Sequence, residues 1–559
     1  MIRITDLRLP LDHPPEALDA AIAARLGIDA GMLRDRVIAR RGYDARKRSA
    51  ILLTYSVDVA TDDDAALLTR LHGVANVSAT PDTTYRFVLP RVAPGATRLP
   101  PDASRPVIVG AGPCGFLAAL VLAQMGLAPI VLERGKAVRE RTQDTWGFWR
   151  NAQLQPESNV QFGEGGAGTF SDGKLWTQIR DPKHYGGKVL AEFVAAGAPE
   201  EILYVSKPHI GTFRLVKMVE CMRASIEALG GEFRFESRVV DFLTEPHPSP
   251  TAQGAARRIR GVALAGGEVI RSDHVVLAIG HSARDTFALL DSCGVRLEAK
   301  PFSLGLRIEH PQSLIDRVRF GANAGHPLLG AADYKLVHHC TNGRSVYSFC
   351  MCPGGQVVAA ASEAGGVVIN GMSQYSRAER NANAALVVGV TPEDFPGGPL
   401  AGIDFQRQWE RRAFELGGRD YAAPVQRVGD FLAGRASSAL GAVIPSYQPA
   451  VRPCDLSECL PDYAVAALRE ALPAFERTIP GFCMPDAVLT GVETRTSSPV
   501  RIPRDAQFQS VSTVGLYPAG EGAGQAGGIM SAAIDGIRVA EAIALSLAGR
   551  SAAPAQTRN

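Results

Sequence analysis

A glycine-rich turn between an apolar strand and an apolar helix constrains this chain more than any other feature. The turn is Gly110-Ala-Gly112-Pro-Cys-Gly115; a predicted buried strand precedes it at 107–109, and an apolar helix is predicted over 114–125. Gly110 permits the tight turn, Gly112 lets the backbone approach a pyrophosphate, and Gly115 lets helix and strand pack closely. The first amides of the helix then point at the anion. The motif therefore predicts a dinucleotide-binding unit.

An acidic residue stands at the end of the next predicted strand. That strand covers 128–132 and ends in Glu133, whose carboxylate can accept both ribose hydroxyl protons of an adenosine. An isolated GxGxxG is a weak signal, and a turn of purely structural use is the alternative. The order of strand, turn, helix, strand and acid favours the nucleotide cofactor.

Length and composition restrict the class of protein. With 559 residues, 46% of them hydrophobic and 21% charged, and a net charge of +2, the chain is a multidomain globular protein whose charge does not demand nucleic acid. The first residues lack the apolar core of a signal peptide, and no run is long enough to cross a membrane. We therefore expect no membrane partner and a cytoplasmic location. Nine scattered cysteines do not indicate a disulfide framework.

A proline-rich passage over 89–105 predicts a stiff linker and divides the chain. Before it, strands are predicted at 2–9, 50–59 and 85–89, and helices at 15–26 and 64–71. This order predicts a small ferredoxin-like α/β module over residues 1–95.

Beyond the linker, strands and helices alternate. A strand is predicted over 232–242, a hairpin over 257–270 around Gly266-Gly267, and a very apolar strand over 274–280. Helices are expected at 376–386, 404–416, 463–475 and 529–547. The last residues, 550–559, are expected to be a disordered tail.

Four separated segments together resemble a known group of proteins. They are the GxGxxG turn with Glu133, the glycine-rich segment from Phe162 to Lys174, the apolar strand ending at Gly280, and the C-terminal Pro-Ala-Gly520-Glu521-Gly segment. This combination resembles flavoproteins with two dinucleotide-binding domains, of the glutathione reductase and p-hydroxybenzoate hydroxylase type. More narrowly, the phrases at 163–175, 280–286, 350–355 and 495–501 look like a group of bacterial FAD-dependent dehydrogenases, also described as NAD(P)/FAD-dependent oxidoreductases.

The resemblance implies an α/β fold class. It implies a Rossmann-like FAD-binding domain, a mixed α+β substrate domain and the small N-terminal ferredoxin-like α/β module. The expected divisions are 1–95 for the module, 96–292 and 510–549 for the two parts of the FAD-binding domain, and 293–509 for the substrate domain.

The resemblance also implies which residues hold FAD. Glu521 would hold the ribitol or pyrophosphate side, although many relatives carry Asp there, so the partner of the longer side chain stays open. The amides at 527–530 would face the N1 and O2 edge of the flavin, and the backbone of Val239 or Val240 would contact adenine. The complete expected set is Gly110, Gly112, Pro113, Cys114, Gly115, Glu133, Arg134, Gly166, Gly168, Thr169, Ser171, Val239, Val240, Gly280, Gly520, Glu521, Gly527, Gly528, Ile529 and Met530.

Two residues are candidates for catalysis. His281 follows Gly280, so its imidazole would lie close to the cofactor, where its charge could switch near neutral pH and it could donate a proton. The alternative is that His281 packs at the start of a helix over 284–290. Lys174 could stabilise a reduced anionic flavin, or it could pair with Asp172 in solvent.

Arg495 and Arg501 are candidates for binding a substrate carboxylate or phosphate, with a structural ion pair as the alternative. Cys350 and Cys352 would place both thiols on one face of a strand, where apolar packing is the favoured interpretation. A metal shared with His338, His339 and Cys340 was the alternative, and no metal site is predicted.

The expected function is that of an FAD-dependent oxidoreductase, a dehydrogenase or reductase that transfers hydride between a small-molecule substrate and flavin N5. One glycine-rich turn does not predict a dedicated NAD(P)H domain, but NAD(P)H stays open as electron donor. Two alternatives remain. The basic stretch over 34–48 would let a flavoprotein grip tRNA or another large substrate. In the other, FAD is structural in a non-catalytic interaction protein.

Overall fold

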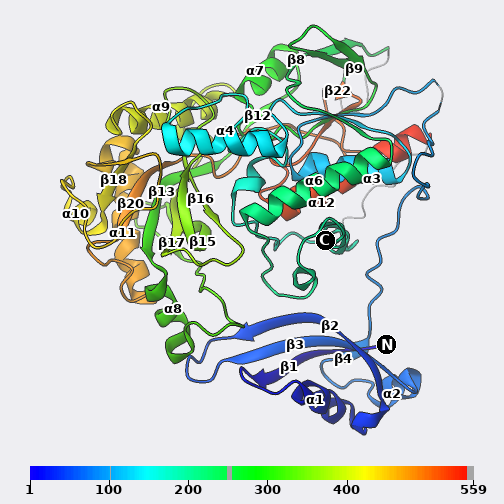
Figure 1. Cartoon of the computed structure of the whole chain (residues 1–559). Helices are drawn as coiled ribbons and strands as arrows, with labels where there is room; N and C mark the ends of the chain where they lie inside the picture. Colours follow the sequence, from blue (N-terminus) through cyan, green and yellow to red (C-terminus); the bar gives the residue numbers. More distant parts are fainter. Residues whose placement is uncertain (101, 249–254, 550–559) are drawn as a thin grey trace.

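The computed structural model of this chain describes residues 1–100, 102–248 and 255–549, and the expected tail at 550–559 lies outside these ranges. Figure 1 shows an N-terminal module set apart from a larger body that contains a parallel sheet and a large mixed sheet. None of the helices within the described ranges combines the length and the apolar character that a membrane span requires.

The N-terminal module is a four-stranded sheet with two helices. Its elements are β1 (Ile2–Pro10), α1 (Glu16–Leu26), β2 (Leu33–Asp44), β3 (Leu52–Thr61), α2 (Asp64–Arg70) and β4 (Val77–Ala79). The strands are ordered β2-β3-β1-β4, and all neighbours are antiparallel.

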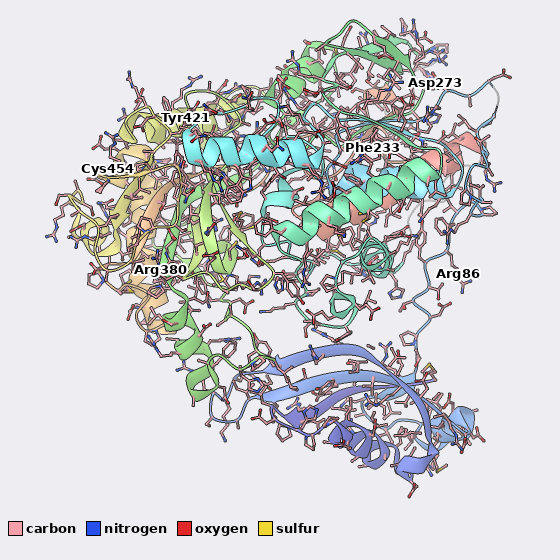
Figure 2. The ribbon with its side chains drawn as sticks, in the orientation of Figure 1. Arg86, Phe233, Asp273, Arg380, Tyr421 and Cys454 are labelled. Atoms are coloured by element: carbon pink, nitrogen blue, oxygen red, sulfur yellow. The ribbon has the colours of Figure 1, made fainter. Side chains whose placement is uncertain are left out.

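The prediction of a strand at 85–89 is wrong, because β4, earlier in the chain, is the last strand of this sheet. Residues 80–100 leave the module as a connecting segment, in which Figure 2 marks Arg86. Tyr85 contacts the body of the molecule instead, where its hydroxyl donates to Glu541 of the C-terminal helix over 3.0 Å. A tertiary contact thus replaces the sheet pairing that the local pattern predicts.

A five-stranded sheet forms the centre of the body, and all its neighbouring strands are parallel. It is ordered β23-β11-β5-β6-β7, from β5 (Val107–Val109), β6 (Ile130–Leu132), β7 (Glu232–Arg234), β11 (Val275–Leu277) and β23 (Leu516–Pro518). Helices α3 (Pro113–Gln124) and α12 (Ile529–Leu547) lie side by side against it, with α5 (Tyr185–Ala195) and α6 (Thr212–Ala228) nearby. Four of its strands are apolar and buried, as expected for a sheet covered on both faces.

The single strand expected at 232–242 is in fact two strands in different sheets. Glu236 has φ 52°, a left-handed conformation that ends β7 before β8 (Val239–Pro246) begins. β8 belongs to a second sheet with β9 (Arg257–Leu264), β10 (Val269–Arg271) and β22 (Thr513–Val514). β9 and β10 form the predicted hairpin, and α7 (Arg284–Ser292) packs against β8.

The third sheet is large and mixed. Its main order is β14-β15-β17-β13-β20-β18-β19, with β16 paired to β15. The strands are β13 (Phe302–Pro311), β14 (Val337–His339), β15 (Ser345–Ala359), β16 (Ile369–Ser373), β17 (Asn381–Val390), β18 (Ala423–Arg427), β19 (Val451–Pro453) and β20 (Val488–Glu493). Helices α8 (Gln312–Phe320), α9 (Ala401–Leu416), α10 (Val428–Ala433) and α11 (Asp462–Thr478) surround it. Figure 2 places Tyr421 and Cys454 on this side of the molecule and Phe233 on the parallel-sheet side.

The helix expected at 376–386 is wrong, since most of this segment is strand β17. It lies between β13 and β15, where Ala382 and Ala384 are fully buried. Alanine favours a helix in isolation, but pairing on both edges and burial on both faces outweigh that preference. A short pair, β12 (Glu298–Ala299) with β21 (Val500–Arg501), stands beside this sheet.

The glycine-rich segment from Phe162 to Lys174 is held in place by one buried arginine on α4 (Val138–Asn151). Arg141 is completely buried and donates to the backbone carbonyls of five residues, over 2.6 to 3.2 Å: Asn159, Val160, Gly163, Glu164 and Gly166. All five of its N–H groups are thereby used. Burial lowers the pKa of Arg141 to about 10, so the guanidinium is still charged at neutral pH.

We expect Arg141→Met to lower the free energy of unfolding by about 3 kcal/mol or more, because it leaves five carbonyls without their donor. Arg141→Lys offers three donors and should lose less. The measurement is denaturant unfolding. The control is Arg150→Met on the exposed end of the same helix, which should change stability by less than about 1 kcal/mol. Equal losses for Arg141→Met and Arg150→Met would contradict this role.

Candidate functional site

A cavity of about 710 Å³ lies at the carboxyl ends of four strands of the parallel sheet and extends to the large mixed sheet. In open parallel sheets, this is where ligands bind. Most of the predicted site residues line it: Gly110, Gly112, Pro113, Cys114, Glu133, Arg134, Gly166, Gly168, Ser171, Lys174, Val239, Gly280, His281, Arg495, Gly520, Glu521, Gly527, Gly528, Ile529 and Met530. The fold thus brings together segments more than 400 residues apart.

Four predicted site residues do not line the cavity. A Cβ on Gly115 would collide with the Gly110 carbonyl, so this glycine serves the close packing of helix and strand. Thr169 is buried beneath the glycine-rich segment beside Arg141. Val240 points outward with 39% of its surface exposed, and Arg501 is exposed on β21. The packing role expected for Gly115 is confirmed, Val239 is the residue of the Val239–Val240 pair that lines the cavity, and neither Thr169 nor Arg501 does.

Two helix N-termini face the cavity without a side-chain cap. The N-caps are Gly112 for α3 and Gly528 for α12. The first amides of a helix need acceptors, and the helix dipole favours negative charge there. A Cβ built on Gly112 would meet only the Gly166 Cα, at 3.8 Å, and one on Gly527 would meet nothing within 4 Å. Packing within the protein does not require glycine at these places, which leaves room for a ligand to touch the backbone.

Glu133 joins three segments of the site through its carboxylate. Oε2 accepts from the amide of Ala111, and Oε1 accepts from the amides of Gly135 and Gly163, each over 2.9 Å. Three of about four acceptor positions are thus occupied. One acceptor position, at Oε2, is left free by these contacts, which is fewer than the two that the sequence analysis expected for ribose hydroxyls.

The neighbouring Arg134 is engaged as well. Its guanidinium bonds Glu157 and Asp285, and it stacks over the Phe162 ring with 4.3 Å to the centroid.

The C-terminal glycine segment is positioned by a buried ion pair that the sequence did not reveal. Asp535 of α12 accepts from the Gly520 amide over 2.8 Å and pairs with Arg504. Arg504 also donates to the Pro518 carbonyl over 2.8 Å. The next residue, Glu521, faces the cavity, and burial raises the pKa of its carboxyl to about 7, while Lys300 opposes that shift. Near neutral pH this carboxyl can therefore donate as well as accept a hydrogen bond.

His281 lines the cavity with a neutral imidazole. Burial, followed by the charges of Arg495 and Arg284, lowers its pKa to about 3. The expected charge switch near neutral pH is therefore wrong. The Nδ1 atom is 2.9 Å from the Ser282 hydroxyl, and Ser282 donates to Gln161, a cavity residue that the sequence reading missed. His281 is thus held in a fixed orientation.

Arg495 belongs to a buried charge network. It bonds the Glu410 carboxylate and the hydroxyls of Ser282 and Ser362, so four of its five N–H groups are used. Glu410 also pairs with Arg284 over 2.7 Å, and the two guanidiniums lower the pKa of Glu410 despite its burial. Arg495 consequently connects segments that follow strands of the two sheets. Its guanidinium is therefore not free to bind a substrate anion, which was one of the two expectations.

Lys174 lies beside two cysteines in the cavity lining. The Lys174 ammonium donates to the Met351 carbonyl and lies 3.4 Å from Asp172. Burial alone would lower the pKa of Lys174, but Cys352, Asp172 and Cys350 outweigh it and raise the pKa. Cys350 has φ 41° at a bulge of β15 and is exposed to the cavity, whereas Cys352 is buried. The two thiols therefore do not share the exposure that a regular strand would give them.

The N-terminal module contacts the chain at Tyr204 and Asn323, which precede two residues of the cavity lining. The Arg41 amide donates to the Tyr204 carbonyl over 2.7 Å, and Asn323 donates to the Arg48 carbonyl over 3.0 Å. Lys207, which follows Tyr204 in the chain, and Asp333, which follows Asn323, form a 2.7 Å ion pair in the cavity lining.

Comparison with known proteins defines the class. Residues 301–496, which contain most of the large mixed sheet, match the model of a family described as FAD-dependent protein, C-terminal domain-like. Residues 1–60 match a domain of unknown function, DUF8436. A protein of Clostridium beijerinckii, described as uncharacterized, is 47% identical over 546 residues, which cover 97% of this chain and 98% of the clostridial protein. The chain belongs to the same family as that clostridial protein.

Solved structures give weaker likenesses. L-proline dehydrogenase from P. horikoshii is 13% identical, with 81% of this chain and 96% of that chain covered and a TM-score of 0.33. L-amino acid deaminase from Proteus myxofaciens is 12% identical, with 85% and 96% covered and a TM-score of 0.32. These TM-scores are too low to establish a shared fold.

The neutral state of His281 is testable. Because its folded pKa lies below the unfolded value, the unfolded chain binds a proton that the folded chain refuses as pH falls from about 6.5 to about 3. His281 therefore removes stability on acidification through that window. By NMR, we expect its ring signals, assigned by their loss in His281→Gln, to stay those of a neutral imidazole from about pH 8 to about pH 5. A titration with a midpoint inside that range would contradict the neutral assignment.

Proposed function

We propose that this protein is an FAD-dependent oxidoreductase that binds FAD in the 710 Å³ cavity. One observation carries the proposal: two uncapped helix N-termini, of α3 and α12, open into one cavity beside glycines that leave space for a ligand. A dinucleotide has two anionic or electron-rich parts, the pyrophosphate and the carbonyl edge of the flavin, that need such donors.

The lining supports one orientation of the cofactor. The pyrophosphate would lie on the N-terminus of α3, with the adenosine toward Glu133 and the backbone of Ser237 to Val239. The flavin would then lie between the glycine-rich segment at 166–173 and the N-terminus of α12. In this orientation Glu521 would face the ribityl chain or the pyrophosphate, where its raised pKa lets it share a proton with an oxygen.

The proposal includes the domain organisation. The parallel sheet with α3 supports a Rossmann-like FAD-binding domain over 96–292 and 510–549, and the family match over 301–496 falls within the proposed substrate domain, 293–509. The strand order β2-β3-β1-β4 and the βαββαβ element order support a ferredoxin-like module within residues 1–95. The module would frame the entrance of the cavity through its contacts with the Lys207 and Asp333 segments.

Bound FAD supplies hydride transfer at flavin N5, and the chain supplies position, charge and exclusion of water. Lys174 would place a positive charge on the substrate side of the flavin, next to the Cys350 thiol. His281 would accept or donate a hydrogen bond without carrying charge. A small-molecule substrate would enter past Lys207, and NAD(P)H would be the electron donor in the reductase form of the reaction.

The tRNA alternative depends on free positive charge in the N-terminal module. Within the basic stretch at 34–48, however, Arg34 pairs with Asp62, Arg36 with Asp19 and Arg46 with Asp44. Three of the seven basic residues of the stretch are thus paired, which reduces the positive charge available to RNA without removing it. RNA binding that falls steeply with salt would favour the tRNA alternative.

Gly112→Val tests the cofactor site. Its side chain has space in the protein but would occupy the place of the pyrophosphate, so we expect the FAD content of the purified protein to fall at least about tenfold. The measure is flavin absorbance per protein chain. Gly187→Val, at an exposed position of α5 where a Cβ meets nothing within 4 Å, should keep its FAD. Retained FAD in Gly112→Val, with unchanged folding, would overturn the site.

Anaerobic addition of NADH or NADPH to the flavin-loaded protein tests the reaction class. Bleaching of the flavin absorbance is expected if the protein is a nicotinamide-driven reductase. If neither donor bleaches it, photoreduction followed by candidate oxidised substrates separates a dehydrogenase from the non-catalytic alternative. A flavin that no donor or acceptor changes would refute the enzyme proposal and leave the cofactor as structural.

A further inference from the structure

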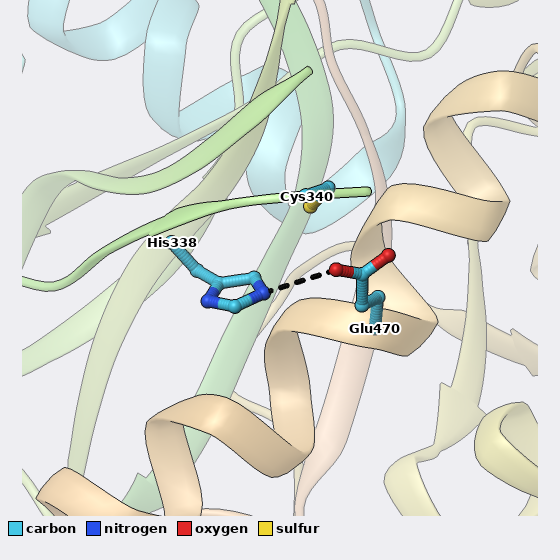
Figure 3. A group of neighbouring side chains, drawn as sticks. All are labelled: His338, Cys340 and Glu470. Carbon is cyan, nitrogen blue, oxygen red and sulfur yellow. Dashed lines mark hydrogen bonds and ion pairs between the residues drawn. The ribbon is translucent and has the colours of Figure 1, made fainter. Parts of the chain in front are cut away.

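Three side chains with different ligand atoms meet at the edge of the large mixed sheet, outside the cavity. They are His338 in β14, Cys340 just after it, and Glu470 on α11. Their imidazole nitrogen, sulfur and carboxylate oxygen all lie within 4.8 Å of one another, and the His338 Nε2 atom is 3.2 Å from Glu470 Oε1. Figure 3 shows the three side chains pointing toward one another from the strand and the helix.

The arrangement follows from local structure. Alternate residues of an extended segment point to the same side, so His338 and Cys340 face α11 while His339 faces away. α11 packs across β14 and its neighbours, which brings Glu470 opposite the pair. His339 bonds the Ser345 hydroxyl through Nδ1 over 2.8 Å and takes no part in the cluster.

The carboxylate is oriented by its own neighbours. Thr341 donates to Glu470 through its amide, over 2.9 Å, and through its hydroxyl, over 2.6 Å. Outer contacts of this kind fix metal-binding carboxylates in proteins. Cys340 is buried, and its thiol has only a 3.5 Å contact to the Ala467 carbonyl. His338 and Glu470 keep 25% and 32% of their side-chain surface exposed, which leaves a path for an ion and a water.

We propose that His338, Cys340 and Glu470 bind a divalent transition-metal ion of the zinc type, with water as the fourth ligand. Nitrogen, sulfur and oxygen donors together suit Zn²⁺ and not Mg²⁺ or Ca²⁺, which take oxygen ligands. Metal–ligand distances of about 2.0 to 2.3 Å put ligand atoms about 3.2 to 3.8 Å apart, so the side chains need to close by about 1 Å.

Binding releases the Cys340 proton to solvent, and the His338 proton moves from Nε2 to Nδ1 by exchange with solvent, so that Nε2 and the Glu470 carboxylate each form a bond to the ion in place of their hydrogen bond. The ion would join the edge strand β14 to α11. The earlier idea of one site shared with Cys350 and Cys352 is corrected. In the strand register His338 stands opposite Val346, whereas the two cysteines lie farther along β15 beside Lys174.

The test uses the full-length protein with its flavin, stripped of metals by a chelator and titrated with Co²⁺ and then Zn²⁺. We expect one equivalent of Co²⁺ to produce a near-ultraviolet thiolate-to-cobalt absorption band in difference spectra, and Zn²⁺ to displace it. Cys340→Ser should abolish the band, and His338→Ala and Glu470→Gln should weaken Zn²⁺ binding by at least about tenfold. Thermal unfolding of the metal-free variants verifies that each is folded.

Two matched controls complete the design. His339→Ala removes the adjacent imidazole on the opposite strand face, and Cys454→Ser removes a partly exposed thiol elsewhere; both should keep the band and the affinity. A band that survives Cys340→Ser, an equal loss in either control, or no stoichiometric binding would overturn the proposal. Because none of the three ligands lines the cavity, flavin content is a separate readout, and failure here leaves the flavin assignment unaffected.

Discussion

The site depends on the charge of Arg141, which is held inside the protein by five backbone carbonyls. A glycine-rich segment has little side-chain packing of its own and a large entropy to lose on ordering. The guanidinium supplies the missing interactions, and Glu133 completes them by accepting the amides of Ala111, Gly135 and Gly163. One cation and one anion thereby fix the turn, the strand end and the glycine-rich segment around a shared cavity.

Two further groups of charges act in the same way at other borders of the cavity. Asp535 and Arg504 hold the C-terminal glycine segment, while Arg284, Glu410 and Arg495 join the parallel-sheet side to the large mixed sheet. Removing one partner of such a buried pair leaves an uncompensated charge, which is costly. The helix N-termini are different, because no side chain caps them. The backbone donors of α3 and α12 therefore face the cavity without a side-chain acceptor.

Local pattern was a good guide where one segment decides its own conformation. The strands around the GxGxxG turn, α12 and the β9–β10 hairpin lie where periodicity and turn residues predict them. Local pattern gave wrong predictions where contacts with distant segments determine the conformation. β17 contains an alanine-rich sequence but is paired on both edges, and residues 85–89 lose their expected strand because Tyr85 bonds Glu541. Pairing energies between segments far apart in sequence are not visible in a local window.

The sequence by itself predicted the kind of ligand site from glycines where a backbone could approach an anion, an acid at the end of the second strand, and backbone amides at the starts of two helices. Spacing along one chain segment is enough for these, because each is a property of a few consecutive residues. Only the tertiary structure decided which side chains are free to act. Arg495 is bonded to Glu410, and His281 is neutral because it is buried beside two cations. Cys350 lies in the cavity lining, and His338, Cys340 and Glu470 lie close together outside it. Hydrogen-bond partners and desolvation depend on what lies across space, and the order of residues does not contain that information directly.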